Sequence, residues 1–412
     1  CDGKRIVVLS AMEGTTDELI EIADYLYKKN ADGAKELISV LEQKYCDMVR
    51  EILEDADHIQ SVQKAIIDRF DDIREYSKDI FTKFEEKKIV AQGAQLCTYL
   101  MSEYLAEKGI ETTHLPALSF MRIDKNEEPD TNFIKDELTQ MLQNAPADAQ
   151  LFITEGAICQ NAYKETDHLG LGGNDYTAAL IGAAVHAEEI TFWSDSIGIY
   201  NNNPMIVKNA KPVEALSFDE AAELSYFLTR IIHPTSILPA KLANVPVRLM
   251  NVGQPDKKGT IISTRFTPGR IEAVAAKDGI TSILIKSSRM LFAHGFLRRV
   301  FEIFESYKTA IDMVTTSEIG VSITIDNNKH LDDIVDDLKK FGNVSISRDM
   351  TIISAIGDLP ENNIGFQANI LSALKEIPIR MISYGGSVHN ISFLIRTKDK
   401  EAALNALDKH LF

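Results

Sequence analysis

Leu169-Gly170-Leu171-Gly172-Gly173-Asn174-Asp175, continued by Tyr-Thr-Ala-Ala-Leu-Ile-Gly-Ala-Ala-Val-His up to residue 186, is the stretch that decides the fold of this chain. A loop with three glycines leads directly into an apolar helix rich in small residues. Glycine lets a backbone approach a ligand closely, and a helix start offers free N–H groups and a positive dipole end. The stretch therefore predicts an anion-binding turn. Because most glycine loops are only turns, this interpretation depends on the segments around it.

The overall composition is that of a globular protein. The chain has 412 residues, 45% of them hydrophobic, and a formal net charge of −17. Its length predicts about two or three domains, and no apolar run approaches the roughly 20 residues that a membrane helix needs. A strongly negative chain repels nucleic-acid phosphates. We therefore expect a cytoplasmic protein that binds neither nucleic acid nor membrane.

The cysteines and the first residues fit the same interpretation. The four cysteines are far apart and show no metal-ligand spacing: Cys1, Cys46, Cys97 and Cys159. We expect reduced thiols and no metal site. The chain opens with Cys-Asp-Gly-Lys-Arg, without an initiator Met and without a secretory pattern.

Predicted strands and helices alternate in the part of the chain before residue 256. The expected strands are 5–11, 112–118, 149–154, 189–193 and 245–249, and the expected helices are 34–53, 66–84, 93–108 (entered through Gly93), 176–186 and 218–231. This alternation predicts an α/β fold with a mostly parallel sheet between helices. Ligands on such sheets bind beyond the carboxyl ends of the strands. The charged helical block over 16–88 carries no chemistry and is interpreted as a solvated cap or partner surface.

The character of the sequence changes at the polar turn Asp256-Lys257-Lys258-Gly259-Thr260, where we place a domain boundary. Beyond it we expect two strands within 271–286 around Lys277-Asp278-Gly279, and further strands at 321–325, 344–346, 350–356, 379–384 and 390–395. The expected helices are 295–306, 330–341, 364–374 and 400–411. Two α+β units with a strand–helix–strand–strand–helix order follow from this pattern.

Several segments in a fixed order carry a family resemblance. They are Ile6-Val-Val-Leu-Ser-Ala-Met, the glycine stretch, Thr191-Phe-Trp-Ser-Asp-Ser-Ile-Gly-Ile-Tyr, Ser217-Phe-Asp-Glu-Ala-Ala-Glu-Leu and His233-Pro. Together they resemble the aspartate kinases (aspartokinases) of the amino-acid kinase superfamily, over essentially the whole chain. The resemblance implies an amino-acid kinase domain over 1–256, lacking the family's first strand. It also implies two ACT-like units, which bind small amino acids, over 262–342 and 343–412.

The resemblance also implies the chemistry. Aspartate kinases transfer the γ-phosphoryl group of ATP, with Mg²⁺, to the β-carboxylate of L-aspartate, at the entry to lysine, threonine and methionine synthesis. The acceptor is already ionised at neutral pH, so catalysis rests on positioning and positive charge. Feedback by lysine or threonine would act through the ACT units, which would also form a dimer. Some relatives continue into a homoserine dehydrogenase. This sequence ends at Phe412 before any dinucleotide-binding fingerprint, so we expect no such activity from it.

The family's site residues map onto this chain as follows. Asp175 would be catalytic, and the substrate-binding residues would be Ser10, Thr16, Gly172, Gly173 and Asn174. The nucleotide-binding residues would be Ser194, Asp195, Tyr200 and Arg230. The effector-binding residues would be Met290, Phe296, Leu297, Ile311, Asp312, Thr316 and Ser317.

Several departures from the family reduce the positive and negative charge of the site. Leu171 replaces the loop arginine, Ala94 replaces a glutamate that would face the substrate ammonium, and Met205 replaces another arginine. The family's opening Lys-Phe-Gly-Gly segment is also missing, so the sequence is a fragment, lacks ordered residues before it, or is an altered member. We expect the chain as written to be poorly active or inactive as a kinase.

Alternative interpretations of single residues remain open at this stage. Asp175 or Ser10 could cap a helix, His233 could pack at a helix end, and Trp193 on a short apolar strand could be core. Asp195 and residues 201–203 could be turn chemistry. Met290 and Phe296 could be core residues rather than part of an effector pocket.

At the level of the whole protein, the competing hypothesis is a vestigial kinase fold that senses an amino acid for a partner. A sibling kinase acting on acetylglutamate or glutamate is improbable, because of residues 217–224 and the ACT-like tail.

Overall fold

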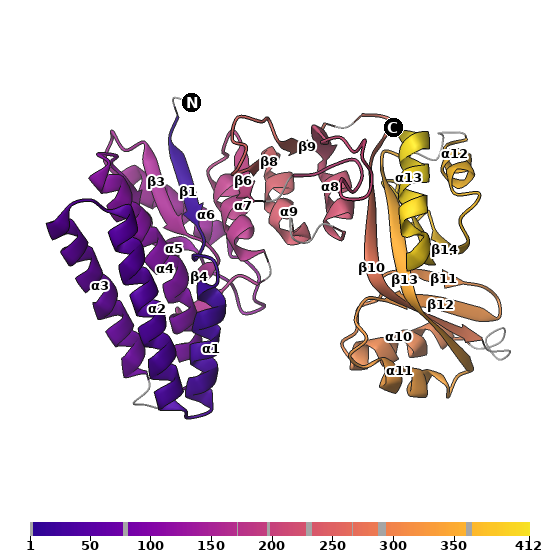
Figure 1. The fold of residues 1–412 in the computed structure, drawn as a ribbon, viewed down its shortest axis with the longest axis horizontal. Coiled ribbons are helices and arrows are strands. Elements are labelled where there is room, and N and C mark those ends of the chain that lie inside the picture. Colours follow the sequence, from indigo (N-terminus) through magenta and orange to yellow (C-terminus); the bar gives the residue numbers. More distant parts are fainter. Residues whose placement is uncertain are drawn as a thin grey trace. The chain divides into compact units, whose positions relative to one another are not determined.

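The chain folds into two compact units. The computed structural model describes residues 3–76, 81–170, 172–195, 198–227, 233–265, 267–286, 294–359 and 365–412. The first unit contains Cys1–Phe192 and Ile232–Val247, and the second contains Trp193–Ile231 and Arg248–Phe412. Each unit is therefore built from two separate stretches of the sequence, which the colours of Figure 1 distinguish.

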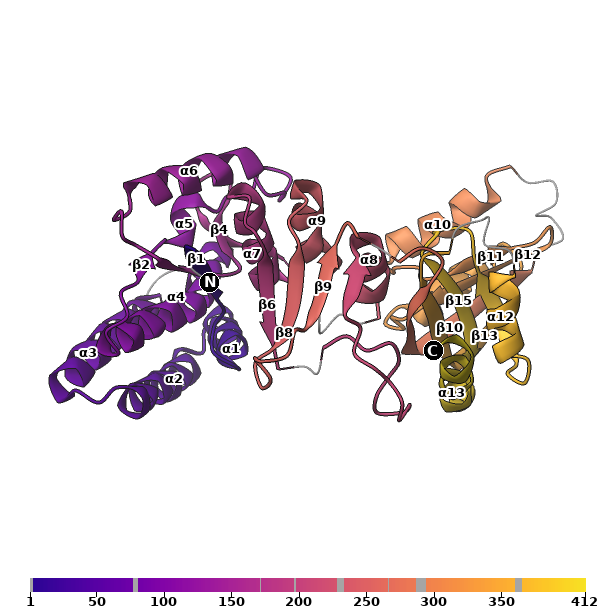
Figure 2. The ribbon, with the colours of Figure 1, turned by 90° about the horizontal axis from the view of Figure 1, so that it is seen from above.

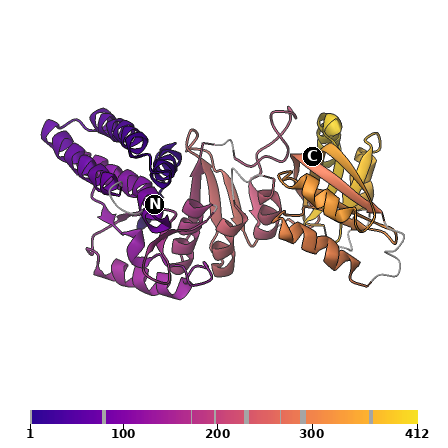
Figure 3. The same cartoon turned by 90° about the horizontal axis from the view of Figure 1, so that it is seen from below.

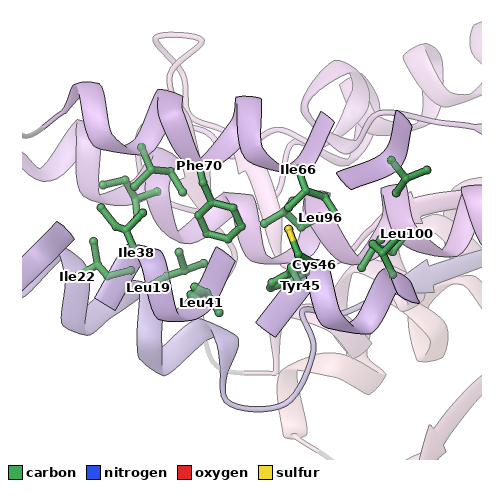
Figure 4. Packing of buried hydrophobic residues seen from close by; sticks show 14 of the residues in the cluster. Leu19, Ile22, Ile38, Leu41, Tyr45, Cys46, Ile66, Phe70, Leu96 and Leu100 are labelled. Atoms are coloured by element: carbon green, nitrogen blue, oxygen red, sulfur yellow. The ribbon is translucent and has the colours of Figure 1, made fainter. Parts of the chain in front are cut away.

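Four helices form a layer at the start of the first unit: α1 (Thr15–Tyr27), α2 (Ala31–Ile52), α3 (Ala56–Glu75) and α4 (Lys83–Glu107). Their apolar stripes face one another and form one core (Figure 4). Within it the rings of Tyr45 and Phe70 lie 5.9 Å apart between centroids. Asn30 and Asp55 cap the starts of α2 and α3 by accepting backbone N–H groups, which fixes where these helices begin.

The predicted helix 66–84 is wrong, because its residues belong to two helices. Helix α3 ends at Glu75, and Thr82 and Glu85 form a capping box that starts α4. Residues 77–80 lie outside the described part of the chain. The helical spacing of apolar residues continues through this break, because both helices present apolar residues to the same core.

The predicted helix 93–108 is only the second part of α4, and Gly93 does not start it. A Cβ atom at Gly93 would lie 3.0 Å from the Cβ of Ala11 and 3.2 Å from Cδ1 of Leu19. The glycine is therefore explained by the close approach of α4 to α1 and to the loop before it.

The sheet of the first unit has three parallel strands in the order β1-β3-β2, namely β1 (Arg5–Leu9), β3 (Leu151–Glu155) and β2 (Thr113–His114). Leu9 lies opposite Glu155, and His114 lies opposite Ile153. The carboxyl ends of all three strands therefore meet at one edge. The predicted strand 112–118 is shorter than expected, because Pro116 precedes the short helix α5 (Ala117–Phe120).

Three further helices and a hairpin complete the first unit: α6 (Thr131–Asn144), α7 (Gly173–Ala184), α9 (Pro234–Ala243), β4 (Ile158–Gln160) and β5 (Thr166–His168). Helix α7 packs against α6, α9 and β1. Phe120, Phe152 and Leu180 are buried in the core that these elements share with the sheet.

A second sheet has the order β6-β8-β9-β7, with β6 (Ile190–Ser194), β8 (Val247–Asn251), β9 (Thr260–Ser263) and β7 (Ala215–Ser217) (Figure 2). Helix α8 (Phe218–Ser225) starts at a capping box of Ser217 and Glu220. It is shorter than the predicted helix 218–231, of which 228–231 lie outside the described residues. Trp193 on β6 is 53% exposed, so its interpretation as core was wrong.

The large sheet of the second unit is antiparallel and has six strands in the order β11-β12-β10-β13-β15-β14. The strands are β10 (Ile271–Lys286), β11 (Val314–Thr316), β12 (Gly320–Ile325), β13 (Asn343–Gly357), β14 (Ile379–Ser383) and β15 (Asn390–Arg396). The two α+β units expected from the sequence therefore share one sheet through its central strands.

Strands β10 and β13 are each continuous, so the predictions of two strands in 271–286 and of separate strands at 344–346 and 350–356 were wrong. Lys277 pairs with Ile352 and Ile280 with Met350, which leaves one extra residue on β10. The next pairing places the extra residue on β13. Gly279 and Asp349 have φ of +78° and +57° at these bulges. A bulge bends a strand and increases its twist without ending it.

Helices α10 (Phe296–Ser306) and α11 (Leu331–Leu338) cover one half of this sheet, and α12 (Phe366–Ala373) and α13 (Lys400–Leu411) cover the other (Figures 1 and 3). The final helix has the bounds predicted from the sequence. No helix in the described ranges combines the length and the apolarity needed to cross a membrane.

Phe70 is fully buried in the helical layer, whereas Ile67 on the same helix is 38% exposed. We expect Phe70→Ala to lower the free energy of unfolding by about 3–5 kcal/mol, because it removes a ring and leaves a cavity. The matched variant Ile67→Ala should change it by about 0.5 kcal/mol or less. Urea unfolding followed by circular dichroism measures both, and equal effects would contradict this core assignment.

Candidate functional site

The candidate site lies at the edge where the parallel strands β1 and β3 end. Ser10 follows β1, and Gly156 follows β3. The Gly156 amide donates to the Leu9 carbonyl at 2.8 Å, so the two strand ends remain paired up to this edge. Helix α7 also begins at this edge, as the contact between Asn174 in its first turn and Gly156 shows. The glycine stretch and the strand ends therefore meet, as the position rule for parallel sheets predicts.

Two glycines permit this approach. A Cβ atom at Gly156 would lie 2.5 Å from Oδ1 of Asn174, and one at Gly173 would lie 2.8 Å from the Cβ of Ala157. Both distances are shorter than any ordinary carbon contact. For Gly173 the sequence predicts close approach of the backbone to a ligand, whereas the structure shows close approach to a neighbouring chain segment.

Asp175 is the third residue of α7 and does not cap it. The N-cap is Gly172, which has φ of +75° and makes no side-chain hydrogen bond. Burial raises the pKa of Asp175 to about 6. The helix-cap alternative for Asp175 is thus wrong, and the carboxyl group occupies an environment that disfavours its charge.

The cap alternative for Ser10 is also wrong, because α1 is capped by Gly14 without a side-chain bond. Ser10 and Thr16 are both exposed and are free to contact a ligand. Lys44 on α2 reaches this loop, and its Nζ lies 3.4 Å from the Glu13 carbonyl oxygen and 3.2 Å from the Glu18 carboxylate. The sequence analysis missed this cation because α2 is remote from the loop in sequence.

A second helix start adjoins the glycine turn. His233 caps α9 by accepting from the Thr235 amide, which agrees with its interpretation as a residue at a helix end. A Cβ atom at Gly172 would lie 2.8 Å from both the His233 Cβ and Ser236 Oγ. The Ser236 hydroxyl also donates to the Gly172 carbonyl at 3.3 Å. Two positive helix ends thus adjoin one turn.

Ala94, where the resemblance leads us to expect a glutamate, lies in apolar surroundings. Ala94 is buried in an apolar cluster with residues such as Leu115 and Leu169, and Leu171 lies outside the described residues. No group of three or more side chains that could hold a metal ion was found among the residues the structure describes.

Glu155, at the end of β3, is a buried carboxylate that the sequence analysis missed. Its oxygens accept from His114 Nε2 at 2.7 Å and from the Ala117 amide at 2.8 Å. Burial opposes its ionisation, but these hydrogen bonds outweigh burial and hold the pKa of Glu155 below its ordinary value. An acid immediately before Gly156 at the end of a predicted buried strand was the available signal.

Of the four nucleotide-binding candidates, the described ones belong to the second unit. Ser194 ends β6 and its carbonyl accepts from the Val252 amide at 2.9 Å, Asp195 is exposed, and Tyr200 forms a β-bridge with Pro212. Arg230 lies outside the described residues.

The segment after Tyr200 is fixed to the large sheet of the second unit. The Val274 amide on β10 donates to the Asn201 carbonyl at 2.7 Å. The Asn202 side chain donates to the Leu404 carbonyl on α13 at 3.1 Å, and Val207 is buried in the core beneath α12 and α13. Asn201 and Asn202 are buried, so they do more than form a surface turn.

The residues after α8 make a second connection to the same sheet. The Tyr226 hydroxyl donates to Asp312, and Lys277 Nζ lies 3.7 Å from the centre of the Tyr226 ring. Burial, together with the hydrogen bond to Asp312, raises the pKa of Tyr226 above its ordinary value. Burial also raises the pKa of Asp312 to about 6. Phe227 packs against a small cluster that includes Met313 and Met350.

The effector-binding candidates gather around α10 and β11. Phe296 is buried in the core under α10, which confirms its interpretation as core, and Ile311 packs against that core. Leu297 is partly exposed, and Thr316 and Ser317 lie exposed at the turn after β11. The half-buried Asp312 carboxylate accepts from the Tyr226 hydroxyl. Met290 lies outside the described residues.

The chain matches two protein-family models. Residues 1–251 match the model of the amino acid kinase family, and residues 353–411 match an ACT domain model. The chain is 28% identical to lysine-sensitive aspartokinase 3 of Escherichia coli, covering 99% of this chain and 92% of that protein. It is 30% identical to chloroplastic aspartokinase 1 of Arabidopsis thaliana, covering 99% and 74%.

Solved structures resemble the chain over the same length. E. coli aspartokinase III in complex with lysine and aspartate superposes with a TM-score of 0.80 at 28% identity, covering 99% of this chain and 93% of that one. Clostridium acetobutylicum aspartate kinase has a TM-score of 0.83 at 22% identity, covering 100% and 93%, and it supports the fold alone. The fold class predicted from the sequence is therefore confirmed.

Because the pKa of Asp175 is raised in the folded chain, the folded state binds a proton that the unfolded chain releases. The stability that this proton contributes is present at low pH and is lost as pH rises through about 6. We expect Asp175→Asn to stabilise the chain by roughly 1–3 kcal/mol at pH 8 and by much less at pH 4.5. Urea unfolding at both pH values measures this, with exposed Asp136→Asn as control. A variant less stable than the wild type at pH 8 would contradict it.

Proposed function

We propose, because this chain belongs to the aspartokinases of the amino acid kinase family, that it transfers the γ-phosphoryl group of ATP to the β-carboxylate of L-aspartate. One observation carries the proposal: the start of α7 adjoins the carboxyl ends of β1 and β3 and the start of α9. Two anionic reactants need positive potential at the place where they meet, and helix N-termini supply it.

In this proposal the amides of Gly172, Gly173 and Asn174 bind anionic oxygens, and Ser10 and Thr16 bind the carboxyl groups of L-aspartate. The acceptor carboxylate attacks phosphorus without a general base, because it is already ionised. Asp175 orients the reactants at the start of α7. With a pKa of about 6, it is mostly ionised at neutral pH.

In the same proposal, the nucleotide binds to Ser194, Asp195, Tyr200 and Arg230. ATP enters with Mg²⁺ as its substrate complex, and the metal offsets phosphate charge. A crystal structure of E. coli aspartokinase III, 28% identical to this chain, contains aspartate and ADP, which supports both ligands as the first to test.

We further propose that turnover is slow. Ala94 is packed among apolar side chains where the family places a glutamate, and Met205 is 88% exposed where the family places an arginine. Leu171 leaves the glycine turn without its arginine. Helix dipoles replace only part of the missing side-chain charge, because each dipole contributes less than an ionised side chain would in a site without water.

For regulation, we propose that an amino acid, lysine or threonine, binds near Leu297, Ile311, Asp312, Thr316 and Ser317, with Phe296 in the core beside them and Met290 as a further candidate. One relative is named as lysine-sensitive, which makes lysine the first candidate. We also propose a catalytic domain over 1–256, ACT units over 262–342 and 343–412, and a dimer formed through the ACT units. The described free cysteines Cys46, Cys97 and Cys159 are compatible with the cytoplasm, in which the pathway to lysine, threonine and methionine would place the protein.

A second candidate is an amino-acid sensor with a vestigial kinase site. Two observations favour it. Ala94 offers no charge to a substrate, and Val207, shortly after Tyr200, is buried in the core of the regulatory sheet. Such a protein would bind the effector and transmit the change to a partner without phosphoryl transfer.

A coupled assay with L-aspartate, ATP and Mg²⁺ tests the catalytic proposal. We expect ADP release that depends on aspartate, with turnover below the range of about 1–100 per second that is usual for kinases. Leu171→Arg combined with Ala94→Glu should tighten aspartate binding by about tenfold or more, because it restores partners for the carboxylate and the ammonium. The matched variant Leu171→Arg with Ala94→Gln adds the same volume without the charge and should tighten binding less. No difference between the two variants in calorimetry would argue against this placement of the ammonium.

Thermal-shift measurements separate the enzyme from the sensor. A ligand that binds only the folded chain raises its melting temperature, by about 2–4 °C per kcal/mol for a unit of 150–250 residues. We expect lysine or threonine, and also ATP with Mg²⁺, to stabilise the protein, with methionine as the comparison amino acid. Stabilisation by an amino acid but never by nucleotide would favour the sensor and count against the kinase.

A further inference from the structure

Ala157, in the loop between β3 and β4, contacts both ends of the glycine turn. Its carbonyl accepts from the Leu169 amide at 2.8 Å, where the turn begins. Where the turn ends, Gly173 packs against the Ala157 side chain. The position of the turn therefore depends on the conformation of one residue in the neighbouring loop.

That conformation is unusual for alanine. Ala157 has φ of +65°, in the left-handed region that residues with a Cβ atom rarely occupy. Such a conformation persists only where the surroundings fix it, and it is often associated with functional sites. The interaction that fixes it here comes from α7.

The Thr177 hydroxyl supplies this interaction. Its Oγ1 accepts from the Ala157 amide at 3.0 Å and donates to the Gly173 carbonyl at 2.7 Å. Thr177 is fully buried, so neither bond competes with bulk water. One hydroxyl therefore joins the loop after β3 to the first turn of α7.

We infer that Thr177 is a positioning residue of the anion-binding turn, and that its hydroxyl holds Ala157 and Gly173 in register. Its bridge sets where the Gly172, Gly173 and Asn174 amides and the Asp175 carboxyl lie relative to the ends of β1 and β3. The role in ligand binding rests on the proposed function, whereas the bridge itself does not.

Thr177→Val keeps the shape of the side chain and removes the hydroxyl, whereas Thr177→Ser keeps the hydroxyl. The control is Thr98→Val, because Thr98 is equally buried on α4 and its Oγ1 has no hydrogen-bond partner. A hydroxyl that matters only for general packing would give the same result at positions 98 and 177.

Titration of the Asp175 carboxyl by NMR is the first readout, because its burial depends on how α7 begins. We expect its midpoint in Thr177→Val to fall from about 6 toward the ordinary value near about 4, and to be unchanged in Thr177→Ser and Thr98→Val. An unchanged midpoint in Thr177→Val, or the same fall in Thr177→Ser, would overturn the inference.

Calorimetric binding of L-aspartate and of ADP is the second readout. We expect Thr177→Val to weaken aspartate binding by about tenfold or more and Thr177→Ser to restore it. If the wild type binds neither ligand, the proposed function fails, and the Asp175 titration still decides the positioning role. If Thr177→Val does not fold, hydrogen exchange of the wild-type Ala157 amide decides it. Slow exchange supports the bridge, and fast exchange overturns it.

Discussion

The close approach of two backbone segments, at the end of β3 and the start of α7, is the constraint on which the site depends. Gly156 and Gly173 make it possible, because a Cβ atom at either position would overlap the facing segment. The approach brings the N-terminus of α7 to the edge where parallel strands end, and α9 begins beside it. Positive potential therefore arises from backbone geometry, and the Thr177 bridge across the approach keeps that geometry in place.

The charges of the chain explain why backbone geometry has to supply much of the positive potential at the site. The chain has a net charge of −17, and Leu171, Ala94 and Met205 are uncharged at positions where the family resemblance leads us to expect charged residues. Burial of the Asp175 carboxyl raises its pKa to about 6. Such an environment lowers stability at neutral pH, a cost that proteins accept at functional positions.

The second unit combines the six-stranded sheet with the segments that we propose bind the nucleotide. Asn202 and Val207, shortly after Tyr200, are fixed to α13 and to the core beneath it. Tyr226, just after α8, is hydrogen-bonded to Asp312 beside β11. Residues of this sheet and residues near the proposed nucleotide segments therefore share one packed body.

The sequence alone determined the fold class, most element positions and the importance of the glycine stretch, because periodicity, glycines and ordered motifs are local signals. It failed at the break between α3 and α4, at Gly93, at the exposed Trp193 and at the bulged strands β10 and β13. Only the tertiary structure revealed Glu155, Lys44 and Thr177, and only it excluded capping roles for Asp175 and Ser10. The reason is physical: burial, hydrogen-bond partners and close approach depend on segments that are distant in the chain, and no local pattern records which segment will face a given side chain.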